Sequence, residues 1–251
     1  MERRNFIKQC FLAGLSVSIA PQLINAAENI KNYTKQPAIK LKQDDVILFQ
    51  GDSITDCYRG KSDPKVNDST SLGIGYTLYT ATGILADYPK LNLQIHNRGI
   101  SGNRTDDLLR RWQSECIDLK PTVLSLLVGV NDYLHVFKHN YKGTVVEFRQ
   151  YYTELLERTV EALPNTKLII GEPFYIRDAS GVPDNWKNIY TYQDVVRELA
   201  NSYNALFIPY QSEFDELCKE VPVKYWTPDS IHPGLAGRYA MAKIWRKYTG
   251  I

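Results

Sequence analysis

The sequence has few of the features that mark disulfide-rich, nucleic-acid-binding, metal-binding or membrane-spanning proteins. Its 251 residues contain only four cysteines, and the formal net charge is only +2. No run of lysine or arginine lies beyond the extreme N-terminus, so we expect no nucleic-acid partner. No cysteines or histidines cluster with the spacing of metal ligands, so we expect no metal or other cofactor. No apolar run after residue 27 is long enough to span a bilayer.

The first 27 residues have the order of an export signal. Arg3 and Arg4 precede the apolar run FLAGLSVSIA, and small residues follow at Ala26 and Ala27. The segment RRNFIK resembles a twin-arginine signal, although Glu rather than Ser or Thr stands before the arginine pair. We therefore predict a bacterial signal peptide over residues 1–27 and a periplasmic or secreted protein without stable membrane insertion. The alternative is an uncleaved helix that anchors the chain.

Cleavage there leaves three cysteines, Cys57, Cys116 and Cys218. Because the count is odd, at least one thiol is unpaired or pairs outside the chain, and disulfides do not organise the fold. Residues 28–43 are polar with one proline, which predicts a linker. The remainder, 44–251, is long enough for one domain with a sizeable core.

Short apolar runs alternate with longer stretches of helical spacing after the linker. Strands are predicted over residues 46–50, 93–97, 123–128, 167–171 and 205–208. Helical faces are predicted within residues 108–119, 148–163, 195–203 and 235–245. This alternation predicts an α/β fold: one three-layer α/β/α domain with a five-stranded parallel sheet covered on both faces.

Ligands of such sheets bind beyond the carboxyl ends of the strands. GDS ends the first predicted strand at Ser53, HNRGISGN follows the second, and GVND follows the third. Near the C-terminus, WTPDSIHPG contains Asp229 and His232. These two are three residues apart, so both side chains can face the same way in a tight turn.

In these four blocks the chain resembles the SGNH hydrolases, also called the GDSL-type esterases, from about residue 46 to the C-terminal helix. The resemblance implies a flavodoxin-like fold, Ser53 as nucleophile, and Asp229 and His232 as the rest of a catalytic triad. It also implies that Gly102 and Asn131 donate to an oxyanion, together with the Ser53 amide. Ile54 replaces the usual leucine of the GDSL block and keeps an aliphatic side chain.

Each block alone is typical of an ordinary turn or loop, and it is their conjunction and order that favour catalysis. A serine hydroxyl needs a base to accept its proton, which His232 would supply, while Asp229 would orient the imidazole. Thr55 replaces the second glycine of a Gly-x-Ser-x-Gly elbow, which argues against a lipase-type α/β-hydrolase. Asp52 and Asp56 flank the serine but are not expected to be a carboxylate pair for glycoside hydrolysis, because such pairs need particular separations across a sugar and Asp52 belongs to the GDSL block.

The segments 58–76, 133–144 and 176–190 are the predicted lining of the substrate site. They are polar, with aromatics such as Phe137 and Trp186, which suits a sugar better than a long acyl chain. The prediction is an esterase that removes small acyl groups, mainly acetyl, from a small-molecule or oligosaccharide ester. A lysophospholipase or thioesterase and a non-catalytic glycan-binding protein remain as alternatives. The oligomeric state stays open.

Overall fold

The computed structural model describes residues 37–177 and 186–251. The predicted signal peptide and residues 28–36 of the predicted linker lie outside the described residues. In the remaining linker residues, the N–H of Ile39 donates to the carbonyl of Thr249 at 2.8 Å. Among the described residues, no helix is both long and apolar enough to cross a membrane.

Five parallel strands form one sheet in the order β2-β1-β3-β4-β5. The predicted α/β class and the parallel sheet are confirmed, and no strand end differs from its predicted position by more than one residue. The strands are almost entirely buried because helices cover both faces of the sheet. Their bounds are β1 Val46–Gly51, β2 Gln94–Asn97, β3 Val123–Leu127, β4 Lys167–Gly171 and β5 Leu206–Ile208.

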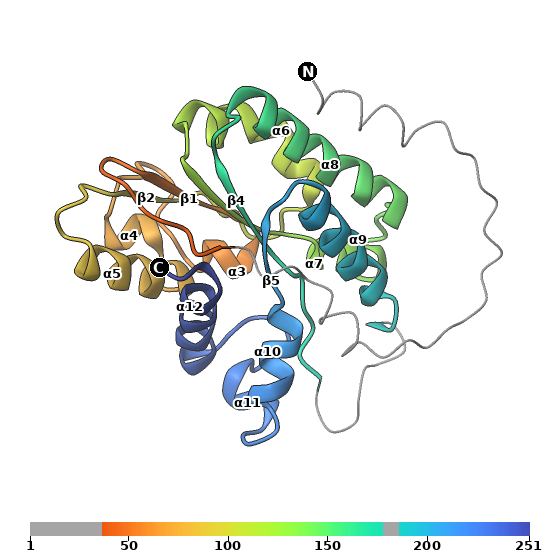
Figure 1. Ribbon diagram of the computed structural model, residues 1–251. Helices are drawn as coiled ribbons and strands as arrows, with labels where there is room; N and C mark the ends of the chain where they lie inside the picture. The colour runs from red at the N-terminus through yellow and green to blue at the C-terminus, as the bar shows by residue number, and fades with distance from the viewer. Residues whose placement is uncertain (1–36, 178–185) are drawn as a thin grey trace. The chain divides into compact units, whose positions relative to one another are not determined.

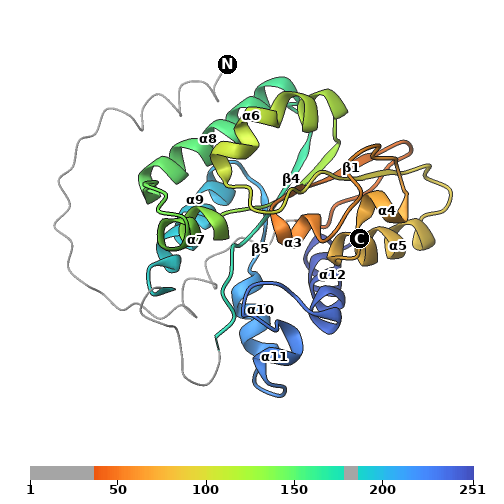
Figure 2. The same cartoon turned by 180° about the vertical axis from the view of Figure 1, so that it is seen from behind.

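The longer helices form the two outer layers (Figures 1 and 2). On one face α6 packs against α8 and α8 against α9, and on the other α5 packs against α12. These helices are α5 Tyr76–Asp87, α6 Thr105–Glu115, α8 Val145–Ala162, α9 Ile189–Ser202 and α12 Leu235–Thr249. The shorter helices are α3 Ser53–Asp56, α4 Ser69–Leu72, α7 Val130–Lys138, α10 Tyr210–Leu217 and α11 Val223–Trp226, with a 3₁₀ turn η1 at Ile117–Leu119.

Two buried tryptophans are part of the helical layers on the two faces of the sheet. Trp245 of α12 packs against Phe49 of β1, with ring centroids 5.5 Å apart, and its indole N–H donates to Ser125 Oγ at 3.0 Å. In the other layer, the indole N–H of Trp112 in α6 donates to Thr159 Oγ1 of α8 at 3.0 Å. Each indole therefore fills the core without leaving a buried donor unpaired.

The strand order decides where a site can form. β1 lies between β2 and β3, which is the flavodoxin-like order, and the connections on its two sides run over opposite faces of the sheet. Such a sheet opens a crevice at the carboxyl ends of β1 and β3. The residues that follow these two strands are therefore brought together, as are those that follow β2.

Candidate active site

Ser53 is the first residue of α3, directly beyond the end of β1. A Cβ atom at Gly51 would lie 2.2 Å from the carbonyl oxygen of Leu127, so only glycine lets β1 come this close to β3. The Asp52 carboxylate accepts a hydrogen bond from the Ile54 N–H at 3.0 Å and caps α3. The sharp turn thus places a serine at the carboxyl edge of the sheet.

Asp229 and His232 lie in the loop between α11 and α12. His232 Nε2 is 2.8 Å from Ser53 Oγ, and His232 Nδ1 is 2.7 Å from Asp229 Oδ2. The second oxygen of Asp229, Oδ1, accepts from the backbone N–H groups of Ile231 at 3.0 Å and His232 at 2.7 Å. The three side chains predicted as a triad therefore form one chain of hydrogen bonds from carboxylate to hydroxyl.

This loop is open to solvent. The His232 and Asp229 side chains are 50% and 55% exposed. Partial burial raises the pKa of Asp229, but hydrogen bonds from the His232 ring and from the two backbone N–H groups outweigh it and lower the pKa overall. The loop is also tied to the chain after β4, because the Ile176 N–H donates to the Ser230 carbonyl at 2.8 Å. Asp229 is thus an ionised group that can orient an imidazole.

The loop between β2 and α6 lies against the serine turn. The Ile100 N–H donates to the Gly51 carbonyl at 3.1 Å, and the Ser101 N–H donates to Asp56 Oδ2 at 2.8 Å. Gly102 follows with φ +83°, a left-handed conformation that favours glycine, and a Cβ atom there would meet only open space. Among the described residues, the backbone N–H of Gly102 and that of Ser53 have no hydrogen-bond acceptor.

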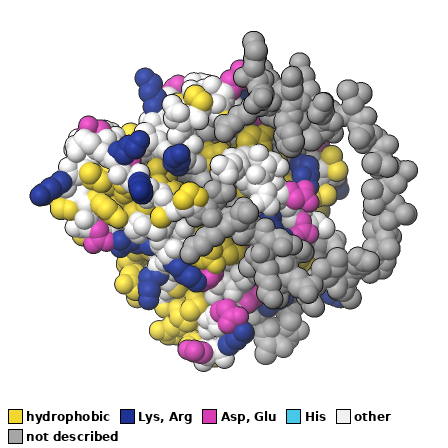
Figure 3. Space-filling model, in the orientation of Figure 1, with side chains coloured by type: hydrophobic (Ala, Val, Ile, Leu, Met, Phe, Trp, Pro, Cys, Tyr) yellow, Lys and Arg dark blue, Asp and Glu magenta, His cyan; other side chains and the backbone are white. Residues whose placement is uncertain are grey.

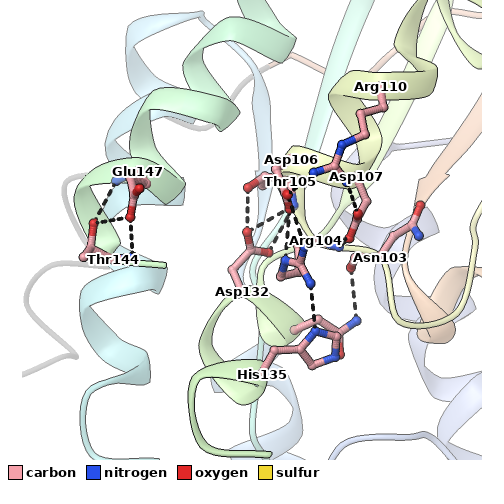
Figure 4. Close-up of polar contacts among 11 residues, drawn as sticks. Asn103, Arg104, Thr105, Asp106, Asp107, Arg110, Asp132, His135, Thr144 and Glu147 are labelled. Carbon is pink, nitrogen blue, oxygen red and sulfur yellow. Dashed lines mark hydrogen bonds and ion pairs between the residues drawn. The ribbon is translucent and has the colours of Figure 1, made fainter. Parts of the chain in front are cut away.

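Asn131 is the second residue of α7, just after β3, and its side chain is buried. Its Nδ2 donates to the carbonyl of Asn103 at 3.1 Å (Figure 4). This bond fixes the amide beside the Gly102 loop and uses one of its two N–H donors, which leaves the other for a ligand. The structure therefore brings Asn131 to the loop that carries Gly102, and the Ser53 turn lies against the same loop.

Two further buried carboxylates flank these groups. Burial raises the pKa of Asp52 and that of Asp132 to about 7. Asp132 Oδ1 accepts from the Thr105 N–H at 3.0 Å and from Thr105 Oγ1 at 2.5 Å, and so joins α7 to the start of α6 (Figure 4). No role for Asp132 was predicted from sequence patterns; its place directly after Asn131 was the available signal.

A polar cluster that the sequence reasoning missed continues from Asn103 (Figure 4). Arg104 Nε is 3.0 Å from Asp106 Oδ1, and one of its terminal nitrogens is 3.3 Å from His135 Nδ1. Its guanidinium lies 4.1 Å from the centre of the Tyr141 ring. No local sequence pattern indicates this polar cluster, because its members come from the start of α6, from α7 and from the segment after α7.

The residues of the predicted lining segments differ in secondary structure and in exposure to solvent. Residues 178–185 lie outside the described residues. Residues 133–138 belong to α7 rather than to a loop. Phe137 is half exposed, whereas Trp186 is buried and stacks on Tyr175 with ring centroids 4.4 Å apart. Trp186 is therefore a packing residue of an aromatic cluster, while Tyr58 and Tyr225 present exposed rings.

Exposed apolar side chains continue past the histidine along α12. Leu235 and Tyr239 are exposed, and the Tyr239 ring contacts Tyr79 of α5 with centroids 5.7 Å apart. On the face seen in Figure 3, hydrophobic side chains lie among scattered lysines and arginines. Since α12 begins three residues after His232, an apolar and aromatic surface adjoins the open side of the loop.

Residues 37–177 and 186–251 hold no group of three or more His, Cys, Asp or Glu side chains that could bind a metal ion. The three cysteines in this part of the chain, Cys57, Cys116 and Cys218, are free thiols. Burial raises the pKa of each, which disfavours the reactive thiolate. The polar chemistry at the sheet edge is therefore that of a hydroxyl, an imidazole, carboxylates and amide donors.

A serine hydroxyl hydrogen-bonded to a histidine, which is in turn hydrogen-bonded to an aspartate, beside free amide donors at the edge of a parallel sheet, is an arrangement typical of a serine hydrolase. Residues 49–240 match the model of the GDSL-like lipase/acylhydrolase family. The chain belongs to this family and is a carboxylic ester hydrolase.

Its similarity to known proteins extends over most of the chain. An acetylxylan esterase from Geobacillus stearothermophilus is 33% identical over 215 residues, which are 84% of this chain and 97% of that protein. The crystal structure of an acetylxylan esterase from the same organism superposes with a TM-score of 0.78 over 85% of this chain and 97% of that one, at 29% identity. A Parabacteroides merdae structure, described as a GDSL-like lipase, gives a TM-score of 0.82 at 44% identity over 85% and 99% of the two chains.

Proposed function

We propose that this protein is an esterase that removes acetyl groups from carbohydrate, with Ser53, His232 and Asp229 as its catalytic triad. The observation that carries the proposal is the 2.8 Å contact between Ser53 Oγ and His232 Nε2, in a chain similar to an acetylxylan esterase over almost its whole length. Acetylated xylo-oligosaccharides are therefore the first substrates to test.

The spacing of the three residues supports their roles. Catalytic mutants of the Geobacillus stearothermophilus acetylxylan esterase replace one serine, one aspartate and one histidine. In that protein the serine and the histidine are 179 positions apart and the aspartate is three before the histidine, as for Ser53, Asp229 and His232 here.

In the first half of the reaction, Ser53 Oγ attacks the ester carbonyl carbon while His232 Nε2 takes the hydroxyl proton. Asp229 holds the imidazole in position and stabilises its charged form. The negative charge on the former carbonyl oxygen is met by the N–H groups of Ser53 and Gly102 and by the Asn131 amide. The sugar hydroxyl then leaves with the proton from His232, and an acetyl group remains on Ser53.

The second half uses the same groups with water. His232 takes a proton from a water molecule, whose oxygen attacks the acetyl carbonyl. The tetrahedral oxyanion forms again at the same donors, acetate leaves, and Ser53 Oγ regains its proton from His232. The open loop around Asp229 and His232 suits an oligosaccharide, because a bulky alcohol can reach the serine without entering a closed cavity.

The test compares hydrolysis of p-nitrophenyl acetate, butyrate and octanoate by the wild-type enzyme and by Ser53→Ala. Ser212→Ala is the matched control, since Ser212 lies in α10, outside the predicted lining segments, and its hydroxyl donates to the Pro209 carbonyl at 3.1 Å. We expect turnover to fall steeply from acetate to octanoate, to vanish in S53A and to persist in S212A. Deacetylation of acetylated xylo-oligosaccharides, measured as the release of acetate, then identifies the alcohol part of the substrate.

Other outcomes would overturn the proposal in different ways. Turnover that rises with acyl length would identify a lysophospholipase or thioesterase type of acylhydrolase. Binding of xylo-oligosaccharides without any Ser53-dependent hydrolysis would identify a glycan-binding protein on the same fold.

We also propose that residues 1–27 export the enzyme from a bacterial cytoplasm through the twin-arginine route. The support is the arginine pair before an apolar run. Replacement of both Arg3 and Arg4 by Lys should retain the protein in the cytoplasm, as measured by fractionation. Unchanged export of this double variant would contradict the route.

A further inference from the structure

Asp56 links the nucleophile turn to the loop that carries Gly102. It is the last residue of α3, one turn after Ser53, and it is 1% exposed. Its Oδ2 accepts from the Ser101 N–H at 2.8 Å and from Ser101 Oγ at 2.7 Å. The same oxygen is 2.8 Å from Lys61 Nζ. One buried carboxylate thus holds both donors of the residue that precedes Gly102.

Neighbouring contacts press this loop against α3. Arg59, which is buried, donates from Nε to the Gly99 carbonyl at 2.6 Å. A Cβ atom at Gly99 would lie 2.5 Å from the backbone nitrogen of Asp56, so the two segments meet backbone to backbone. These contacts with α3 therefore fix the loop up to Ser101, whereas Gly102 itself has open space beside it.

The contact between Ser101 and α3 depends on a charged acceptor, the Asp56 carboxylate. Burial raises the pKa of Asp56, but the hydrogen bonds from Lys61 and Ser101 outweigh it and lower the pKa overall. The carboxylate is thus ionised, with Lys61 as its counter-ion. Removing it would leave the Ser101 N–H and hydroxyl without a protein acceptor, so that only mobile water would be left to hold Ser101.

We propose that Asp56 is a positioning residue of the active site, which aims the Gly102 N–H at the oxyanion by fixing Ser101. The peptide unit that joins Ser101 to Gly102 carries this N–H, so the orientation of Ser101 sets its direction. The inference rests on the proposed function, because it assumes that Gly102 donates in the reaction. No other side chain hydrogen-bonds Ser101 within the described residues.

The test compares Asp56→Ala with Glu213→Ala. Glu213 Oε1 accepts from Lys247 Nζ at 2.8 Å and from the Tyr248 hydroxyl at 2.7 Å, so its loss removes bonds of the same kinds, from a lysine and a hydroxyl, at α10 and outside the predicted lining segments. We expect D56A to lower kcat for p-nitrophenyl acetate about 10- to 100-fold with KM unchanged, somewhat less than deletion of an oxyanion donor. E213A should keep kcat within about twofold.

A mimic of the tetrahedral intermediate distinguishes a misdirected Gly102 N–H from a general loss of structure. A boronic acid that adds to Ser53 should bind D56A more weakly by the same factor as kcat falls, and E213A as tightly as wild type. Ser101→Ala covers the case in which D56A does not fold, because Ser101 lies on the surface. Loss of its single hydroxyl bond should lower kcat about 2- to 10-fold.

The outcomes distinguish this inference from the proposed function. If S53A and Asn131→Ala retain activity, the proposed mechanism fails. If both lose activity while D56A and S101A keep wild-type kcat and boronic acid affinity, the positioning role alone is wrong. An equal loss in E213A, or a change confined to KM, would also overturn it.

Discussion

The two sides of the candidate active site are held in different ways. The donor side, made up of the proposed oxyanion donors Ser53, Gly102 and Asn131, lies on strand ends that buried carboxylates fasten together. The base side, made up of the proposed acid–base pair Asp229 and His232, lies in a loop with both side chains half exposed. Under the proposed mechanism, the atoms that stabilise charge are fixed, whereas the path by which alcohol and water reach the base stays open.

The two carboxylates beside Ser53 also differ in the groups that surround them and in their pKa values. Asp52 and Asp56 are equally buried, but burial raises the pKa of Asp52 to about 7 whereas the pKa of Asp56 is lowered. Asp56 has an ammonium ion and two serine donors, whereas the only side-chain hydrogen bond of Asp52 within the described residues is from one backbone N–H. For Asp52 the effect of burial on the pKa dominates, whereas for Asp56 the hydrogen bonds from Lys61 and Ser101 outweigh it.

The largest effect is expected on the base side. His232→Ala should lower kcat by about 10⁴-fold or more, because no other group can take the Ser53 proton. Since the ring is half exposed, added imidazole should restore part of the activity, measured as turnover against imidazole concentration. Asp229→Asn should cost less, about 10²-fold, because water can reach the histidine in place of the carboxylate. A loss in D229N as large as that in H232A would contradict this view of an open loop.

On the donor side, Asn131→Ala should lower kcat about 10²- to 10³-fold with little change in KM. The amide acts on charge that develops only in the transition state. Because Asn131 is buried, added acetamide should not restore activity, in contrast to imidazole with H232A. Rescue by acetamide would show that the donor side is as accessible as the base side.

A smaller effect separates Asp52 from Asp56 in stability. The folded protein binds the Asp52 proton more tightly than the unfolded chain, whose pKa lies near 3.8. Stability is therefore lost as the pH rises from about 4 to about 7, by up to about 1.4 kcal/mol per pH unit. Asp52→Asn stays neutral and should lack this loss, as measured by urea unfolding at pH 5 and pH 7.

The control is Asp56→Asn, for which the sign reverses. The lowered pKa of Asp56 contributes stability above about 4 that is lost at more acidic pH, so the variant should lose stability at pH 7. Parallel pH curves for wild type and D52N would show that Asp52 is not the titrating group.

Much of the fold followed from local pattern. The strands were predictable because parallel strands buried on both faces read as apolar runs, and α8 because Phe148, Tyr152 and Leu155 repeat on one face before Pro164. Four-residue helices such as α3 and α11 are too short to show a period. In α5, buried threonines at Thr77 and Thr80 weaken the contrast between its faces.

The predicted site residues were found because each stands in a short motif at a strand end or before the last helix. The supporting carboxylates were not, since their partners are distant in sequence. Asp56 and Ser101 are 45 positions apart, and Asp132 and Thr105 are 27 apart. Trp186 was predicted to line the site because the segment around it is polar, and such a segment gives no sign of its stacking on Tyr175.

The turn from Asp229 to His232 has an implication for enzyme design. Its internal hydrogen bonds join Asp229 to Ile231 and His232, and the Ile176 N–H, which donates to the Ser230 carbonyl, ties the turn to the chain after β4. A design that moves this pair to another scaffold therefore has to supply one outside backbone N–H besides the four consecutive residues. The proposed oxyanion donors cannot be moved as one segment, because their positions are distributed over three strand ends of the scaffold.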